Sequence, residues 1–387
     1  MYTYDERGNV LTESDGTSVK SYTYNEFDGR ASYTLKVNNV AIASETYAYD
    51  AARQLASVTT DSVKVTYGYD MNGNRITDRT INPTTGLEMS GHNYSFDGAH
   101  RVTQVQGMML VNNGASFIIP VNEVYAYNLD GSMLSKTDRN TSVTTSYSYD
   151  GAGRLTYEVE GTAITTYAYD AANNRTSMYK DGVTTTYTYD ANNRLLTEVK
   201  GSQTTRYTYD ANGNQLSGNG LITYDARGRQ STWTDGLTTA SYTYYPTDLR
   251  KSKTVGAATT NFVWDGQNMV YEYKGSNTTG GTAYYYGLTL ISQGNYAYYL
   301  YNGHGDVVQL VTASNTLGRS YDYDAFGNEV SPSASDTNPF RYAGQYFDSE
   351  TGTYYLRARY YDPGIGRFTQ QDGWAYADTG DSLSLIL

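Results

Sequence analysis

The chain has 387 residues, no cysteine, and 28 Lys and Arg against 40 Asp and Glu, which gives a net charge of −12. An acidic chain neutralises phosphates poorly, which argues against nucleic-acid and membrane-surface binding, and the absence of cysteine excludes disulfides and thiolate metal sites. No run of 18 apolar residues exists, and the three histidines lack metal-ligand spacing, so we expect no membrane span, no metal and no cofactor.

The 44 tyrosines recur in one short phrase, seen in "TYTYDANNRLLTEV" at 186–199. Seven of the twelve intervals between its copies are 20 residues, and the others vary. A fixed period with variable insertions is typical of a repeat array, which we assign to residues 1–264. The second aromatic residue of each copy is Tyr4, Tyr24, Tyr49, Tyr69, Phe96, Tyr127, Tyr149, Tyr169, Tyr189, Tyr209, Tyr224, Tyr244 or Trp264.

Each repeat is predicted to be a β-hairpin. Tyr187 and Tyr189 are two residues apart, so they share one face of a strand, and Thr188 lies on the other. Residues 190–193 form a turn, because Asp bonds its own following backbone and Asn tolerates positive φ. Residues 195–199 alternate as the return strand.

Side by side, thirteen hairpins give about 26 strands, a strip roughly 125 Å long at about 4.8 Å per strand. A sheet of that size has to coil, and closed into one ring it would have a diameter of about 40 Å. The prediction is an all-β fold of repeated β-hairpins, in which a long antiparallel sheet spirals into a hollow shell. Tyrosine suits a wall whose inner side is wet, since its ring packs while its hydroxyl stays bonded to water or to a neighbour.

The period is lost after Trp264. Residues 265–337 still read as strands, in an irregular β region. Residues 338–372 differ in composition, with four arginines and two of the six prolines, and residues 373–387 form a short tail.

The "YxYDxxGN" units, "YLYNGHGDVVQLVTASNTLGRSYDYDAFGN" (299–328) and "FRYAGQYFDSETGTYYLRARYYDPGIGRF" (340–368) closely resemble the RHS/YD-repeat family and the RHS-associated core that ends its repeat region. The likeness is to bacterial polymorphic-toxin and wall-associated members. It implies a partial YD-shell, a hollow β-shell that encloses a C-terminal toxin domain and is closed at one end by the core. The core motif carries over to Arg341, Gly344, Tyr355, Arg357, Arg359, Tyr360, Tyr361, Asp362, Pro363, Gly366, Arg367 and Phe368.

Many members of that family cut themselves with an aspartyl pair, and the resemblance places this pair at Asp372 and Asp381, with Asp378 as a rival. Two close acids cannot both ionise, so one polarises the carbonyl while the other activates the nucleophile. Gln371 stands where some members have arginine, and no second "DPxG" follows it. We therefore expect a shell piece, cut at both ends, with no cargo domain of its own and no self-cleavage.

Other polar residues are expected to be structural. The aspartates of the turns suit hydrogen bonding in the turn better than calcium binding, because each turn offers one carboxylate. His304, near Asp306, reads as a turn residue rather than a general base. Arg357, Arg359 and Arg367 are expected to pair with Asp348, Glu350 and Asp362 rather than to serve a catalytic centre. The turn aspartates are Asp5, Asp50, Asp70, Asp150, Asp170, Asp190, Asp210 and Asp225.

The predicted function is a non-catalytic shell or scaffold of a secreted or cell-surface bacterial protein, with an enclosed polypeptide as its partner. The alternative is a β-solenoid that binds cell-wall or cell-surface carbohydrate. Such modules rely on tryptophan-rich cages, and this chain has only Trp233, Trp264 and Trp374. A self-processing protease is the third possibility.

Overall fold

The computed structural model describes residues 1–111, 116–294, 297–312, 314 and 316–371. They fall into two compact units, each made of separate stretches of chain. The first unit comprises Met1–Val121, Thr243–Asp322 and Glu329–Gly344, and the second comprises Asn122–Tyr242, Tyr323–Asn328 and Gln345–Leu387. Within the described ranges there is no helix long and apolar enough to cross a lipid bilayer.

The predicted hairpins are confirmed, and Asp190 shows how each turn is closed. Strands β17 (Val183–Tyr189) and β18 (Leu195–Lys200) pair antiparallel, with Tyr187 opposite Glu198. The Asp190 carboxylate accepts the N–H groups of Asn192 and Arg194, both at 2.9 Å, and Asn193 adopts a positive φ of 60°. The other turn aspartates also accept backbone N–H groups, so their predicted structural role is confirmed.

In several copies the second tyrosine fastens its hairpin to the preceding one. The Tyr189 hydroxyl donates to the Arg175 carbonyl at 2.8 Å, and Tyr169 and Tyr209 make the same bond to Leu155 and Leu195. In each case the acceptor lies 14 residues earlier. Trp264, which replaces the tyrosine at the end of the array, bonds through its indole N–H to Arg250, also 14 residues back. Of the two partners expected for these hydroxyls, water or a neighbour, the bonds found here go to a neighbour.

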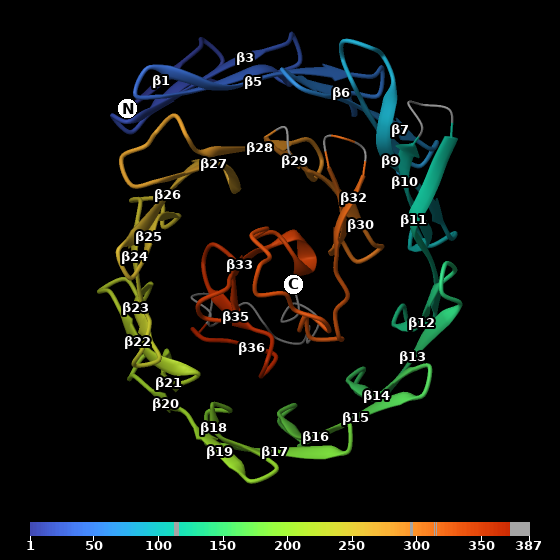
Figure 1. Cartoon of the computed structure of the whole chain (residues 1–387), viewed down its shortest axis with the longest axis vertical. Helices are drawn as coiled ribbons and strands as arrows, with labels where there is room; N and C mark the ends of the chain where they lie inside the picture. The colour runs from blue at the N-terminus through green and yellow to red at the C-terminus, as the bar shows by residue number, and fades with distance from the viewer. Residues whose placement is uncertain (112–115, 295–296, 313, 315, 372–387) are drawn as a thin grey trace. The chain divides into compact units, whose positions relative to one another are not determined.

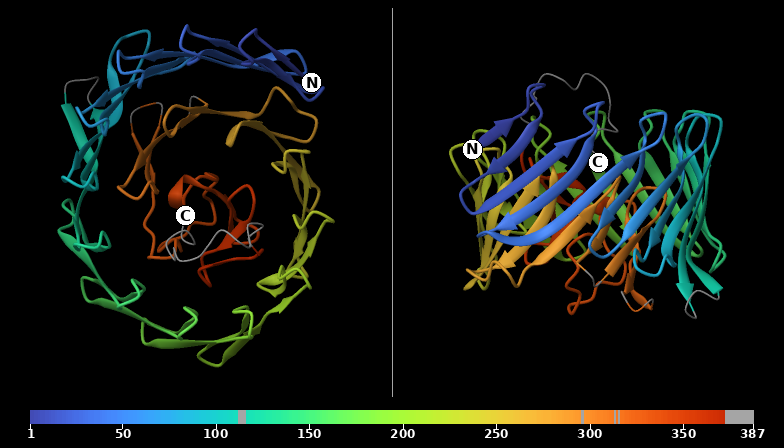
Figure 2. Two further views of the ribbon diagram at one scale, coloured as in Figure 1. Left: turned by 180° about the vertical axis from the view of Figure 1, so that it is seen from behind. Right: turned by 90° about the horizontal axis from the view of Figure 1, so that it is seen from above.

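The first unit is built from two antiparallel layers. Figure 1 shows β1–β10 (blue) outside β26–β32 (orange), and both views of Figure 2 keep the layers adjacent. Its strands are β1 (Tyr2–Tyr4), β2 (Val10–Ser14), β3 (Ser18–Tyr24), β4 (Arg30–Val37), β5 (Val40–Tyr49), β6 (Leu55–Thr60), β7 (Lys64–Tyr69), β8 (Arg75–Ile81), β9 (Glu88–Phe96), β10 (Val102–Val111), β25 (Arg250–Val255), β26 (Ala258–Asp265), β27 (Asn268–Lys274), β28 (Thr282–Tyr286), β29 (Leu290–Gln293), β30 (Ala297–Tyr301), β31 (Val307–Thr312) and β32 (Leu317–Ser320), followed by the short 3-10 helix η2 (Tyr342–Gly344).

A dry core lies between these layers. Tyr33 and Leu35 of one layer, exposed by 1% and 0%, pack with Val263 and Tyr271 of the other. A second cluster joins β6–β10 to β29–β31, with Val58 and Leu300 among its members. The expectation of a wet tyrosine face is therefore wrong in this unit, because a second sheet covers the face that was assigned to solvent.

The second unit contains a curved antiparallel row of strands, drawn green to yellow in Figure 1, and a small four-stranded sheet, β33–β36, drawn red. The all-β class and the antiparallel hairpin repeats are thus confirmed in both units. Its strands are β12 (Met133–Asp138), β13 (Val143–Tyr149), β14 (Leu155–Glu160), β15 (Ala163–Tyr169), β16 (Arg175–Lys180), β17, β18, β19 (Gln203–Arg206), β20 (Thr208–Tyr209), β21 (Gln215–Gly218), β22 (Gly220–Tyr224), β23 (Gln230–Thr234), β33 (Tyr346–Asp348), β34 (Thr353–Tyr355), β35 (Tyr360–Asp362) and β36 (Arg367–Phe368); β11 (Ser116–Tyr127) and β24 (Thr239–Tyr244) have residues in both units.

Candidate functional site

The most distinctive surface of the second unit is one face of its repeat sheet, on which distant parts of the chain are seated. We call residues 345–371 the core segment, residues 324–328 the DAFGN turn, and the side chains of Arg175, Lys180, Tyr187, Leu195 and Tyr207 the docking face. Tyr187, Leu195 and Tyr207 form one buried cluster with Ile365 of the core segment. A row of repeats thus holds a strip of polypeptide against one of its faces.

The core segment forms its own small sheet of buried tyrosines. In β34 and β35, Tyr355 lies opposite Tyr360 and Tyr354 opposite Tyr361, and all four are at most 5% exposed. Two of their hydroxyls leave this sheet and bond to the DAFGN turn: Tyr361 to the Phe326 carbonyl at 2.9 Å, and Tyr354 to the Gly327 carbonyl at 3.1 Å. Tyrosine is used here because the ring packs while the hydroxyl reaches a main-chain acceptor.

The sharp bend of the core motif "DPGIG" depends on Asp362 and Gly366. Asp362 is 6% exposed; its Oδ1 accepts the Gly364 N–H and its carbonyl accepts the Gly366 N–H, both at 2.9 Å. Burial raises the pKa of Asp362 to about 6, although the N–H groups that it accepts act in the opposite direction. Gly366 has a φ of 66°, and a Cβ on it would lie 2.7 Å from Cδ1 of Phe326, so glycine is required.

Arg175 is the central side chain of the docking face. It is 7% exposed, and its Nη2 donates to the Ile365 carbonyl at 3.0 Å and to the Tyr187 hydroxyl at 3.2 Å. Its guanidinium lies 4.6 Å from the ring centre of Phe326 and 4.7 Å from that of Tyr187. These partners are neutral, so this buried charge is stabilised by ring faces and carbonyl oxygen rather than by a carboxylate.

Other bonds between the sheet and the seated segments go to main-chain carbonyls. Arg367 Nη2 donates to Asn193 O at 2.7 Å, the Gln215 N–H to Thr369 O at 2.9 Å, and Asn219 Nδ2 to Thr351 O at 3.1 Å. The ion pair of Lys180 and Asp324, at 3.1 Å, is a side-chain exception. Main-chain carbonyls thus supply much of this contact, together with the side chains of Ile365 and Phe326.

The remaining core-motif residues fall in two places. Arg341 lies in the first unit, 5% exposed, and pairs with Glu329 at 2.8 Å and Asp336 at 3.2 Å. Near it, Gly344 ends η2 with a φ of 63°. In the second unit, Arg359 stacks on Phe368, with 3.8 Å between guanidinium and ring centre, and the Pro363 carbonyl accepts from Asn328 at 2.9 Å.

Arg367 does not have the carboxylate partner that was predicted for it. Its guanidinium donates to the Asn193 carbonyl and lies 5.3 Å from the ring centre of Tyr189. The structure places Arg357 on Gln345. An arginine on a strand end can reach a neighbouring turn more easily than a carboxylate of its own segment, which charge counting alone does not show.

The predicted catalytic aspartates Asp372 and Asp381, like Asp378, lie outside the described residues. The last described residue is Gln371, whose side chain contacts the turn at Gly213. His304 sits in a turn, as expected, with Nδ1 2.9 Å from Asp306 Oδ1. Among the described residues no group of His, Asp and Glu has the arrangement of a metal site.

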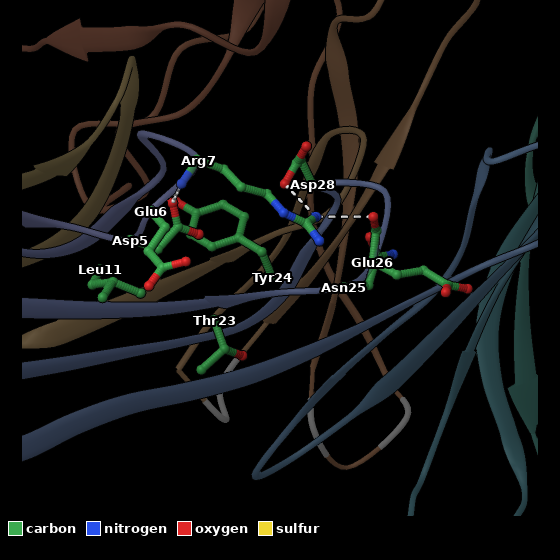
Figure 3. Close-up of a pocket in the computed structure, with 9 residues that line it drawn as sticks. All are labelled: Asp5, Glu6, Arg7, Leu11, Thr23, Tyr24, Asn25, Glu26 and Asp28. Atoms are coloured by element: carbon green, nitrogen blue, oxygen red, sulfur yellow. Dashed lines mark hydrogen bonds and ion pairs between the residues drawn. The ribbon is translucent and has the colours of Figure 1, made fainter.

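A hollow near the first two turns is open and polar (Figure 3). Arg7 crosses it and donates to the Glu26 carbonyl at 3.0 Å and to Asp28 Oδ1 at 3.1 Å. Arg154 makes an equivalent link between later turns, to the Asp170 carbonyl at 2.7 Å. The hollow is therefore a turn-to-turn contact of the repeat, and we assign no ligand to it.

The docking face was missed by the sequence analysis, although one signal of it exists. The first residue after the turn is apolar in some copies, as at Leu155 and Leu195, glutamine in two, and arginine at 30, 75, 175 and 250. A repeat position that changes from apolar to cationic indicates that something different covers that part of the face. Trp233 and Trp264, only 4% and 6% exposed, cannot serve as an open tryptophan cage for sugar.

Comparison with known proteins adds an independent observation. Residues 27–184 match the family model described as Teneurin YD-shell. The chain is 40% identical over 154 residues to a Bacillus spizizenii protein named tRNA3(Ser)-specific nuclease WapA, which covers 37% of this chain and 6% of that protein. It is 30% identical over 154 residues to double-stranded DNA deaminase toxin A of Burkholderia cenocepacia, covering 32% of this chain and 10% of that one.

Solved structures share the fold at low identity. The crystal structure of TcdB2-TccC3-Cdc42 matches 96% of this chain and 23% of its own, with a TM-score of 0.67 and 15% identity. The Photorhabdus luminescens Tc holotoxin pore matches 98% of this chain and 20% of its own, with a TM-score of 0.60 and 17% identity. The chain thus spans a tenth or less of these curated relatives and under a quarter of these solved neighbours.

Proposed function

Because this chain belongs to the RHS/YD-repeat family, we propose that it is the wall of a polypeptide container, which holds cargo without turning over a substrate. The cargo in the parent protein would be a C-terminal toxin domain, and the parent would be secreted or displayed on a bacterial surface. The names of the nuclease and deaminase relatives support a toxin parent.

The observation that carries this proposal is the docking face of the second unit. There a repeat sheet holds a distant segment of chain through buried rings and bonds to main-chain carbonyls, at Ile365, Thr369 and Thr351. A wall that must accept varied cargo needs contacts of this kind, which do not depend on cargo sequence.

The test is to fuse an unstructured, protease-sensitive reporter of about 60 residues after Leu387 and to follow its digestion in the intact protein. We expect cleavage about tenfold slower than for the same reporter on an unrelated soluble domain, because protection tracks how often the wall opens. Arg175→Ala, which weakens the docking face, should shorten the protection. A reporter digested at the free rate in the unmodified protein contradicts the proposal.

Within the described residues, carbohydrate binding lacks the exposed tryptophans on which it would depend. Its sequence rationale rested on tryptophan, and both described tryptophans are buried, with their indole N–H groups bonded to the carbonyls of Asn219 and Arg250.

A further inference from the structure

A cluster of ionisable side chains lies where the two layers of the first unit meet, between β3–β5 and the end of β26. Asp265, the last residue of β26, accepts the Tyr22 hydroxyl at 2.9 Å and is ion-paired with Arg30. One residue earlier, the Trp264 carbonyl accepts the Lys20 ammonium at 2.6 Å. Polar bonds to two consecutive residues therefore fasten β26 to the outer layer, beside an apolar core.

Glu45 of β5 is a second carboxyl in this cluster and is only 4% exposed. Burial, reinforced by the charge of Asp265, raises the pKa of Glu45 to about 7, while the hydroxyl of Tyr47 and the charge of Arg30 act in the opposite direction. The Arg30 guanidinium is already engaged by Asp265 and by the ring of Tyr22, 4.8 Å from its centre. The Arg30 guanidinium is thus the cation nearest to both Asp265 and Glu45. Because it is ion-paired with Asp265, burial favours the neutral acid form of Glu45.

The other cation of the cluster, Lys20, is ion-paired with Glu13 at 2.7 Å. The Tyr33 side chain is 1% exposed, and its hydroxyl is buried without a hydrogen-bond partner. The ionisable groups around Glu45 are Glu13 of β2, Lys20 and Tyr22 of β3, Arg30 and Tyr33 of β4, Tyr47 of β5, Asp61 after β6, Asp265 of β26 and Tyr285 of β28.

We propose that this cluster is a proton-controlled fastening between the two layers of the first unit. With Glu45 neutral, the layers stay closed; when Glu45 loses its proton, the hairpin at 258–274 loosens from β3–β5. The inference concerns the wall itself, so it holds or fails independently of what the wall contains.

The direction of the effect follows from where the proton is bound more tightly. Glu45 binds it more tightly in the closed state than in an opened, hydrated one, so its contribution to closure is fully present below about pH 4.5 and is lost as the pH rises through about 7. The two values correspond to a fall of about 300-fold in the ratio of closed to open seam over the full titration. A container built in this way is tighter in mildly acidic medium than in neutral or alkaline medium.

The test is hydrogen exchange of the whole protein between pH 5 and 8, corrected for intrinsic exchange. We expect protection of peptides covering 40–49 and 258–274 to fall by roughly a hundredfold across this range, while peptides covering 183–200 in the second unit have the same profile in the wild type and in Glu45→Gln. Glu45→Gln, which stays neutral and can still accept the Tyr47 hydroxyl, should give a flat profile. Parallel profiles for the wild type and Glu45→Gln would overturn the proposal.

Two further variants separate proton control from simple packing. Glu198→Gln is the matched control, because Glu198 also accepts a tyrosine hydroxyl, from Tyr207 at 2.9 Å, but belongs to the second unit; it should leave the pH profile of the seam unchanged. Tyr47→Phe removes the donor that favours the charged form of Glu45, so it should move the midpoint of seam opening to higher pH. A lower protection at every pH with an unmoved midpoint would instead assign Tyr47 a packing role and refute proton control.

Discussion

Gly366→Ala tests how closely the core segment is seated on the DAFGN turn. The backbone of Gly366 is left-handed, with a φ of 66°, and this conformation costs an alanine about 1 kcal/mol. The new methyl would also lie 2.7 Å from Cδ1 of Phe326. That ring cannot retreat freely, because it packs edge-on against Tyr167 at 5.3 Å between ring centres and under Arg175 at 4.6 Å. Over-packing of this kind costs about 1–3 kcal/mol, so we expect a total loss of about 2–4 kcal/mol.

The assay is the free energy of opening of residues 345–371, measured by hydrogen exchange under native conditions. Gly161→Ala is the matched control in the same unit: its φ is 58° and nothing lies within 4 Å of a Cβ there, so only the backbone term of about 1 kcal/mol applies. Phe326→Leu in the Gly366→Ala background should recover part of the loss by making room for the methyl. If Gly366→Ala lowers the free energy of opening no more than Gly161→Ala does, the close approach of residue 366 to Phe326 does not govern stability.

Three further changes have definite expectations. Arg367→Ala removes the bond to the Asn193 carbonyl, so the free energy of opening of the core segment should fall by about 1–2 kcal/mol. Limited proteolysis of that segment should therefore become faster, and unchanged digestion would contradict this. Because burial raises the pKa of Asp362 to about 6, the stability that it contributes is lost as pH rises from about 4 to about 6; thermal unfolding should show this slope in the wild type and not in Asp362→Asn. Asp190→Ala removes the acceptor of two turn N–H groups and the partner of Arg194, with an expected cost of about 1–2 kcal/mol in local exchange of 183–200. Asp190→Asn, which keeps an acceptor oxygen, should recover most of that cost, and equal losses in both variants would argue against the turn bond.

The hairpins were predictable because everything that forms them is local. Tyr187 and Asp190 lie in one hairpin, and the bonds that close its turn span two to four residues. The contact of Arg175 with Ile365 spans 190 residues, and nothing in the repeat around Arg175 states which segment will cover it. The sequence period predicts the array of hairpins, whereas the segment that packs on each part of the sheet is decided by contacts between residues far apart in the chain.

The prediction of a wet tyrosine face was wrong in the first unit for a related reason. The prediction treated the sheet as a single layer with one side in water. In the first unit the strands from β26 onward return as a second layer and bury Tyr33. The hydroxyls of tyrosines such as Tyr189 in the second unit bond to a neighbouring hairpin, which was one of the two partners expected for them. Composition alone could not show the return of the chain, because 265–337 carries strand signals without the period that would place it.

In five copies the second tyrosine bonds to a carbonyl 14 residues earlier, and this has a consequence for how such a gene can change. Each bond reaches back by one hairpin only, as from Tyr209 to Leu195, and its acceptor is a main-chain atom that any residue provides. Unequal recombination between repeats could therefore add or delete a whole hairpin without leaving a donor or an acceptor orphaned. The length of the array is thus free to drift by units of one repeat, while a change of half a repeat would disrupt the pairing at once.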